Sequence, residues 1–400
     1  MLIVKKNLIV VFSMVFVLIT IPFNFFYNYM KVKGFFPAIP GVGYPVFGHI
    51  FSLIIFAFFV FNFSFFKKFR IPFYIFLFFS FYIFLFALLN LIYFNYAGDF
   101  SAFNESFVFL MYYISFMVVF SFYYKIDSRI FKILFLLMFF IASIEIDFSK
   151  IIPFSFDNIA GTTDGHINYQ LVSFFMLATW FMFFFKENNL VFRIFFMISM
   201  AFLLLFSGGR SELVGFFISG LATLLAYIIF SDGNKYNKYS LIFLGSFLLF
   251  YIIMYIVSQY SILFESSRHS QILDFESSSS WQEREYLYKM NVQKIIDSPL
   301  LGNYGSHKEL GEGAYIHNAL SAWQQFGVFG FLLYIILILT PVLFSIYYIF
   351  KDKDKYNIYP LFFISIYVMI LCVATKPIFW PYAGISLGLL FSYMKNREAL

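Results

Sequence analysis

The chain has little charge and almost no cysteine. Of its 400 residues 12% are charged, and one residue, Cys372, is a cysteine. Soluble domains carry about 25% charged residues, so an ordinary soluble protein is excluded. A single cysteine excludes a disulfide framework within the chain and a metal site built from several thiolates.

Apolar residues are correspondingly abundant. They make up 62% of the sequence, with 67 Phe and 30 Tyr, and the mean hydropathy is +0.83. A transmembrane helix needs about 20 mostly apolar residues. The sequence predicts twelve such spans: 7–27, 47–66, 71–93, 106–124, 130–147, 167–185, 190–206, 212–230, 239–258, 327–349, 358–375 and 379–394. We interpret the excess of Phe as lipid-facing side chains and expect a single transmembrane domain over residues 1–400.

The basic residues predict the orientation of these spans. If the N-terminus is cytoplasmic, 17 Lys and Arg residues fall in cytoplasmic segments and 5 in short outer loops. An excess of this kind marks the cytoplasmic side. We therefore expect both termini in the cytoplasm and an uncleaved signal-anchor as the first span. The excess of basic over acidic residues then reflects membrane anchoring, and nucleic acid is not an expected partner.

One polar segment, residues 259–316, is far longer than a helix connector needs. It carries 13 of the 48 charged residues and falls on the outer side of the predicted membrane. Loops beyond about 12–15 residues are usually functional or disordered. We expect the chemistry of the protein to be anchored on this loop.

The second half of the loop predicts a helix. Ser280 and Glu283 form a capping-box pattern, and Pro299 ends the helix before a turn with Gly302 and Gly305. The apolar residues recur at helical spacing and are Trp281, Tyr288, Val292 and Ile295. Arg284 is predicted at the edge of this apolar face, either as a snorkelling or cation–π residue or as a functional cation. Glu285 is predicted to pair with Lys289.

Three further positions are candidates for chemistry. His317, with Asn318, begins the next helical pattern, as either a hydrogen-bonded helix-end residue or a group that transfers protons near neutral pH. Arg210 ends the turn Ser207–Arg210, where free backbone N–H groups and a guanidinium could bind phosphate; the alternative is a snorkelling arginine. Lys376, in Thr375-Lys376-Pro377, is another cation on the predicted outer side.

Residues for a carboxylate-bound metal are missing from the predicted outer side. The first outer loop, residues 28–46, has no acidic residue, and the one Asp-X-Asp pattern, at Asp352–Asp354, falls on the predicted cytoplasmic face. His166, His269 and His307 show no ligand spacing. We expect no metal and no other cofactor.

Taken in order, these motifs resemble the bacterial O-antigen polymerase and O-antigen ligase superfamily. The resemblance covers about residues 160–345. It depends on the motifs Ser207-Gly208-Gly209-Arg210, Trp281-X-X-Arg284, Ser298-Pro-Leu-Leu-Gly302, His317-Asn318 and Gly327-Val-Phe-Gly330.

The resemblance implies an all-α, GT-C-like polytopic enzyme of the inner membrane with its site facing the periplasm. The donor would be an undecaprenyl-diphosphate-linked oligosaccharide, with a chain-length regulator protein as a further partner. Arg210 and Arg284 would hold the diphosphate, His317 would take the acceptor proton, and Tyr315, Asn318 and Lys376 would contact substrate. Eight residues separate Asn318 from Gly327, where the ligase pattern has nine, which favours a repeat-unit polymerase over a ligase.

Two other classes of membrane protein fit the sequence less well. A lipid-linked oligosaccharide flippase would carry charges along its spans, whereas here mid-span charges are nearly absent. A membrane O-acyltransferase would need a histidine deep within a span, whereas His317 is predicted at the edge of one.

Overall fold

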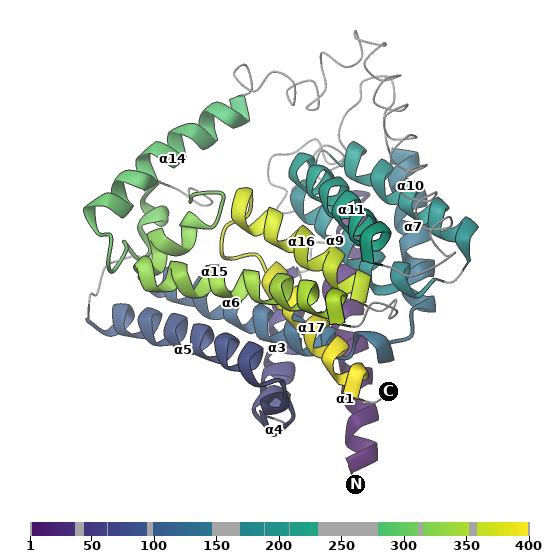
Figure 1. Cartoon of the computed structure of the whole chain (residues 1–400). Coiled ribbons are helices and arrows are strands. Elements are labelled where there is room, and N and C mark those ends of the chain that lie inside the picture. Colours follow the sequence, from purple (N-terminus) through teal and green to yellow (C-terminus); the bar gives the residue numbers. More distant parts are fainter. Residues whose placement is uncertain are drawn as a thin grey trace. The chain divides into compact units, whose positions relative to one another are not determined.

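A computed structural model describes most of the chain (Figure 1). The described residues are 2–36, 44–61, 63–93, 99–145, 169–187, 189–207, 209–230, 279–310, 315–351 and 358–398. Across these ranges every regular element is a helix, which confirms the all-α prediction. The predicted span 239–258 and the first part of the long loop, residues 259–278, lie outside them.

Helices that fit a membrane are abundant in the described ranges. Five are long and apolar enough to cross a bilayer: Val10–Val32, Lys67–Tyr93, Phe100–Phe120, Ser211–Phe230 and Leu320–Lys351. Four shorter apolar helices accompany them: His49–Val60, Gln170–Lys186, Val191–Phe206 and Ile358–Ala374. A chain of this make-up fits a protein embedded in a membrane.

The chain divides into two compact units, and each is built from two separate segments. The first unit comprises Met1–Ile50 and Tyr124–Phe275, and the second comprises Phe51–Tyr123 and Glu276–Leu400. Helix α3 (Tyr44–Phe61) runs from the first into the second.

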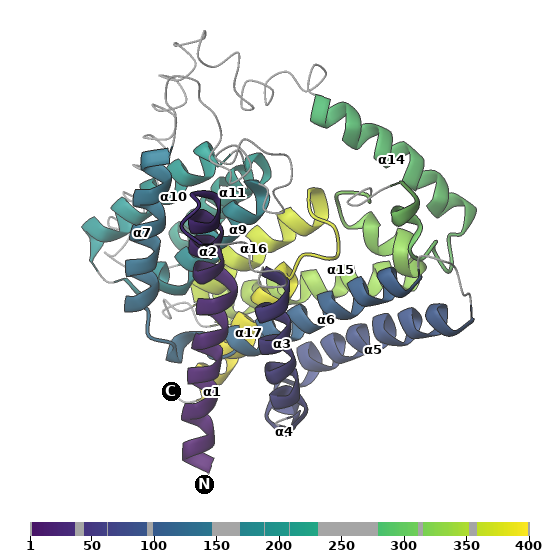
Figure 2. The same cartoon turned by 180° about the vertical axis from the view of Figure 1, so that it is seen from behind.

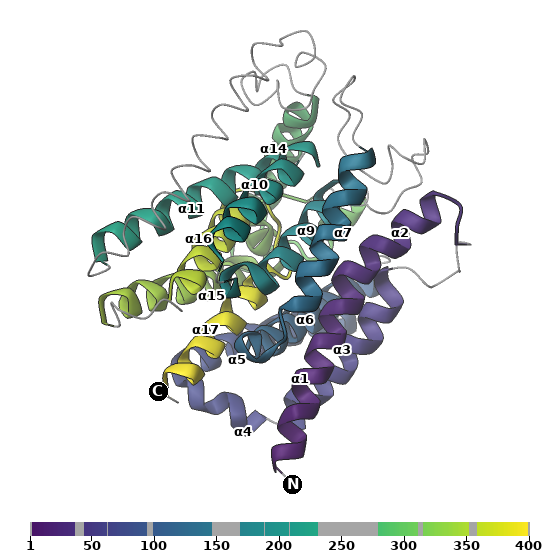
Figure 3. The same cartoon turned by 90° about the vertical axis from the view of Figure 1, so that its right-hand side faces the viewer.

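The first unit consists of helices from the N-terminal quarter and the middle of the chain. They are α1 (Leu2–Leu18), the π-helix η1 (Ile19–Phe23), α2 (Asn24–Val32), α7 (Arg129–Glu145), α9 (Tyr169–Phe183), η4 (Phe184–Lys186), α10 (Leu190–Phe206) and α11 (Arg210–Phe230). Helix α9 packs against both α7 and α10 (Figure 3). The π-turn at η1 contains Pro22, whose missing N–H interrupts the regular helix ladder.

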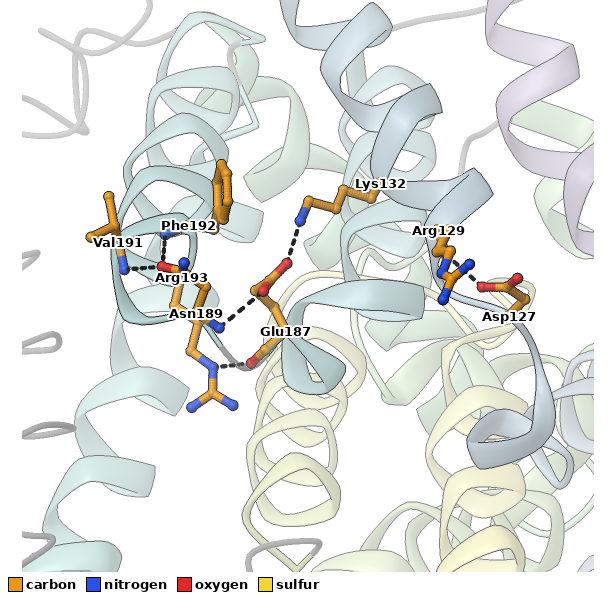
Figure 4. Close-up of polar contacts among 8 residues, drawn as sticks. All are labelled: Asp127, Arg129, Lys132, Glu187, Asn189, Val191, Phe192 and Arg193. Atoms are coloured by element: carbon orange, nitrogen blue, oxygen red, sulfur yellow. Dashed lines mark hydrogen bonds and ion pairs between the residues drawn. The ribbon is translucent and has the colours of Figure 1, made fainter.

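Charged residues tie the ends of α7, α9 and α10 together (Figure 4). Lys132 on α7 forms an ion pair with Glu187, and Arg193 on α10 donates to the main-chain carbonyl of Glu187. Asn189 caps α10 by accepting from the N–H groups of Val191 and Phe192. The charge pattern assigns all of these residues to one side of the predicted membrane, and the structure brings them into direct contact.

The second unit, which includes the helices labelled α5, α6 and α15 in Figure 2, carries most of the candidate site residues. Its elements after α3 are α4 (Phe63–Phe66), η2 (Lys67–Phe69), α5 (Arg70–Tyr93), α6 (Asp99–Phe120), α14 (Ser279–Asp297), η6 (Ser306–Leu310), α15 (Leu320–Lys351), α16 (Ile358–Ala374) and α17 (Tyr382–Glu398). Helix α15 packs against α5 and α16, and α6 packs against α5 and α17.

Two glycines one turn apart bring α17 close to α6. A Cβ on Gly384 would meet the main-chain carbonyl oxygen of Tyr113, and one on Gly388 would meet that of Met117. Small residues at this spacing let helix backbones approach closely in membranes, where van der Waals packing replaces the hydrophobic effect as the force between helices. The contact holds the C-terminal helix on α6.

Helix α15 starts earlier than the span predicted at 327–349, and it breaks where that span was expected to begin. Gly327 has a φ of +70° and a ψ of −176°, so the helix changes direction after its first two turns. The turn at Leu300–Gly302 lies in this break. A Cβ on Gly302 would come within 2.6 Å of the Gly327 nitrogen, and a Cβ on Gly327 would strike the Leu300 carbonyl oxygen.

Candidate functional site

Helix α14 presents Arg284 on its inner face. The helix begins one residue before Ser280 and ends two residues before Pro299, close to the prediction. Arg284 is half-buried, and one and two turns further along the same face lie Leu287 and the fully buried Asn291.

One residue of the predicted apolar face is placed wrongly by the sequence pattern. Tyr288 is 44% exposed, whereas Ile295 is buried as predicted. The face follows the polar Asn291 instead, because its side-chain oxygen accepts a 2.6 Å hydrogen bond from Gln324 on α15. The predicted ion pair of Glu285 and Lys289 is confirmed, at 2.7 Å, on the outer side of the helix.

His317 lies in the short segment that leads into α15. The side-chain oxygen of Asn318 accepts from the N–H of Leu320 and caps the helix, so the predicted helix start is confirmed within two residues. The ring of Tyr315 lies 5.3 Å from the ring of His317, edge to face. His317 therefore directly precedes the residue that caps α15, and its ring packs against that of Tyr315.

Lys376 follows α16 and is almost fully buried, with 1% of its surface exposed. Its N–H donates to the carbonyl of Leu371 at 2.7 Å, which ends the helix, and its ammonium lies 4.4 Å from the centre of the Trp380 ring. Cation–π contact of this kind stabilises a desolvated ammonium.

The electrostatics of His317 show that these groups are neighbours. Burial, together with the positive charges of Arg284 and Lys376, lowers the pKa of His317 from its ordinary 6.5 to about 4, with burial as the largest cause. The imidazole is therefore neutral at pH 7 and able to accept a proton. Two fixed cations beside it provide a place for an anion. The structure thus groups Arg284, His317 and Lys376 with Tyr315 and Asn318.

Arg210, the remaining predicted site residue, is the first residue of α11. The predicted turn between α10 and α11 is present, with Ser207 as the C-cap of α10 and a 2.8 Å hydrogen bond between the hydroxyls of Ser207 and Ser173. The side chain of Arg210 lies outside the described part of the chain, and its backbone belongs to the other unit.

A buried polar chain next to His317 was missed by the sequence analysis. Glu105 on α6 contacts His307 at 3.0 Å and Lys308 at 2.7 Å. The other ring nitrogen of His307 lies 2.9 Å from the amide nitrogen of Gln325 on α15. The one available signal was the carboxylate of Glu105, a charge immediately before a predicted span. His307 itself gives no local signal, because it has no metal-ligand spacing to the other histidines.

Among the residues that the structure describes, no group of three or more His, Cys, Asp or Glu side chains is arranged to hold a metal ion. No protein-family model, curated protein or solved structure matches the chain.

Proposed function

We propose that this chain is a membrane glycosyltransferase of the O-antigen polymerase kind. It would join undecaprenyl-diphosphate-linked oligosaccharide repeat units at the periplasmic face of a bacterial inner membrane. The observation that carries the proposal is the neutral imidazole of His317 beside the cations Arg284 and Lys376. A proton acceptor beside fixed positive charge is what sugar transfer from a lipid diphosphate requires.

The reaction follows from these groups. The acceptor hydroxyl oxygen attacks the anomeric carbon of the donor sugar, and His317 takes the hydroxyl proton. The bond from that carbon to the diphosphate oxygen breaks, and undecaprenyl diphosphate leaves with the electron pair. Arg284, Lys376 and, by resemblance, Arg210 stabilise the negative charge that grows on the diphosphate. The displacement inverts the configuration of the anomeric carbon.

The arrangement of loops supports the predicted orientation. The charge pattern assigns the loops that carry Arg284, His317 and Lys376 to the outer side, and these residues lie within electrostatic reach of one another. Twelve spans with cytoplasmic termini, and a chain-length regulator as partner, remain part of the proposal.

O-antigen ligation is the alternative, because transfer to lipid A-core needs the same donor, base and cations. Deletion of the gene separates the two on a lipopolysaccharide gel. Loss of a polymerase leaves core with a single repeat unit, whereas loss of a ligase leaves bare core.

Variants test the site in the same assay. His317→Ala, Arg284→Ala and Lys376→Ala, at normal membrane levels, should reproduce the single-repeat pattern of the deletion. Lys289→Ala is the matched control, since this lysine lies on the same helix as Arg284 with 72% of its side chain exposed. Full-length polysaccharide from all three site variants would overturn the proposal.

A further inference from the structure

The contacts of Gln325 determine where the proton of His307 lies. The N–H of Gly305 can only donate, and it lies 2.9 Å from the side-chain oxygen of Gln325. The amide nitrogen of Gln325 therefore faces His307 Nδ1 and donates to it. The ring proton must then be on Nε2, which donates to the carboxylate of Glu105. The hydrogen bonds run in one direction, from Gly305 through Gln325 and His307 to Glu105.

This direction excludes His307 as the base that takes the proton of the acceptor hydroxyl. Both ring nitrogens are engaged, and only 2% of the side chain is exposed. Glu105 is likewise committed, because its Oε2 also accepts from Lys308. The chain of hydrogen bonds joins α6 to η6, with the residue before it, and to the first turns of α15.

The ring of His307 packs against two aromatic rings at the candidate site. Its centre lies 5.9 Å from that of Tyr315 and 5.7 Å from that of Phe379. Tyr315 and Phe379 also touch each other, at 5.7 Å, and Tyr315 packs against His317. Phe379 lies three residues after Lys376, on the loop between α16 and α17. Through Tyr315 and Phe379, His307 thus contacts both the segment that carries His317 and the loop that carries Lys376.

We propose that Glu105 and His307 are positioning residues that fix Tyr315 and, through it, hold the imidazole of His317 beside the cations of the site. What His317 does there rests on the proposed function, but its placement does not. A general base must lie within about 2.6–3.2 Å of the proton that it takes. A displacement of 1 Å costs on the order of 10²-fold in rate, so a rigid link from α6 to this segment directly supports the reaction.

The chemical reactivity of His317 tests the placement without any assay of function. Neutral imidazole reacts with diethyl pyrocarbonate, and peptide mass spectrometry separates His317 from His307. In the detergent-solubilised full-length protein the rate at His317 should be nearly constant between pH 7.5 and 5.5. In Glu105→Leu and His307→Phe, a freed and better solvated His317 should regain an ordinary pKa near 6.5, and its rate should fall up to about tenfold over that interval.

Conservative and control variants separate positioning from general damage. Glu105→Gln keeps an oxygen for His307 Nε2–H and should retain most of the wild-type profile. Glu285→Gln changes an exposed carboxylate and should retain all of it. His307→Phe keeps the ring volume, so it remains informative if Glu105→Leu does not accumulate. A wild-type His317 profile in His307→Phe overturns the positioning proposal.

The rate of sugar transfer gives a second readout. Glu105→Leu and His307→Phe should lower kcat on the order of 10²-fold with little change in KM for the lipid-linked donor, because the cations that hold the diphosphate stay in place. An equal loss in Glu105→Gln and Glu105→Leu would contradict a role through hydrogen bonding. If the wild-type protein transfers no sugar, the proposed function fails, while the pyrocarbonate profiles still decide the placement.

Discussion

At the scale of single residues, two neighbouring cations disfavour protonation of His317 as long as no anion is bound between them. Arg284 and Lys376 disfavour the protonated imidazole and help to lower its pKa to about 4. A bound diphosphate would offset those positive charges and raise the pKa of His317, because an anion favours the imidazolium form. In the proposed reaction the base would thus become stronger when the donor is bound.

Removal of one cation should reveal its effect on the pKa of His317 in the absence of substrate. Lys376→Met deletes a buried positive charge that disfavours protonation of His317, so the pKa of His317 should rise above 4. It should remain below 6.5, because burial, the larger cause, persists. The pH dependence of pyrocarbonate modification at His317 measures the change. Lys289→Met, on the exposed side of α14, is the control, and an unchanged profile in Lys376→Met would contradict the electrostatic coupling.

The same shift makes the folded protein sensitive to acid. The pKa of His317 is about 4 when folded and near 6.5 when unfolded, so between these values the unfolded chain binds the proton more readily. The contribution of this group to stability is therefore complete above about pH 6.5 and is lost as the pH falls towards 4. His317→Gln should lose less thermal stability than wild type between pH 7.5 and 5.0. Equal losses in melting temperature would contradict a buried, neutral His317.

At the scale of elements, the break in α15 and the turn after α14 depend on each other. Both Gly302 and Gly327 have a φ of +70°, and each would place a Cβ against the backbone of the other segment. The sequence predicted the turn at Gly302 but placed the start of a span at Gly327. The sequence thus located both glycines, but only the packed structure shows that α15 bends at Gly327 and that the turn at Gly302 fills the bend.

A series of glycine substitutions separates strain from close approach. Gly34 has a φ of +77° with nothing within 4 Å, so Gly34→Ala should cost only the strain of that conformation, about 1–2 kcal/mol. Gly302→Ala and Gly327→Ala add a backbone collision and should lower the melting temperature much more. Gly305→Ala, which meets only the methyl of Ala102 at 3.2 Å, should fall between. Equal effects across the series would contradict the interlocked turn.

At the scale of the whole molecule, local signals were predictable and distant contacts were not. Apolar runs and helical spacing predicted helices, the start of α15 next to Asn318 and the Glu285–Lys289 pair, all of which depend on residues close together in the sequence. Glu105 and His307 are 202 residues apart. The sequence alone carries no signal that joins them, because neither charge pattern nor spacing shows which loops meet.

The predicted orientation can be tested on intact cells with the single cysteine removed. Cys372 is buried, so Cys372→Ala should give a folded background for single-cysteine variants. A membrane-impermeant maleimide should label Lys289→Cys, in the predicted outer loop, and not Lys68→Cys, in a predicted cytoplasmic loop. Both lysines are exposed, so access of the reagent depends on the side of the membrane. The reverse pattern of labelling would contradict the orientation.

The interlock of Gly302 and Gly327 also restricts how this sequence can diverge. At most pairs of touching positions, a larger side chain on one is accommodated by a smaller one on the other. Here the atoms in the way belong to the main chain, which every residue carries, so neither position can compensate for a change in the other. The two glycines must be inherited together, or lost together with the bend.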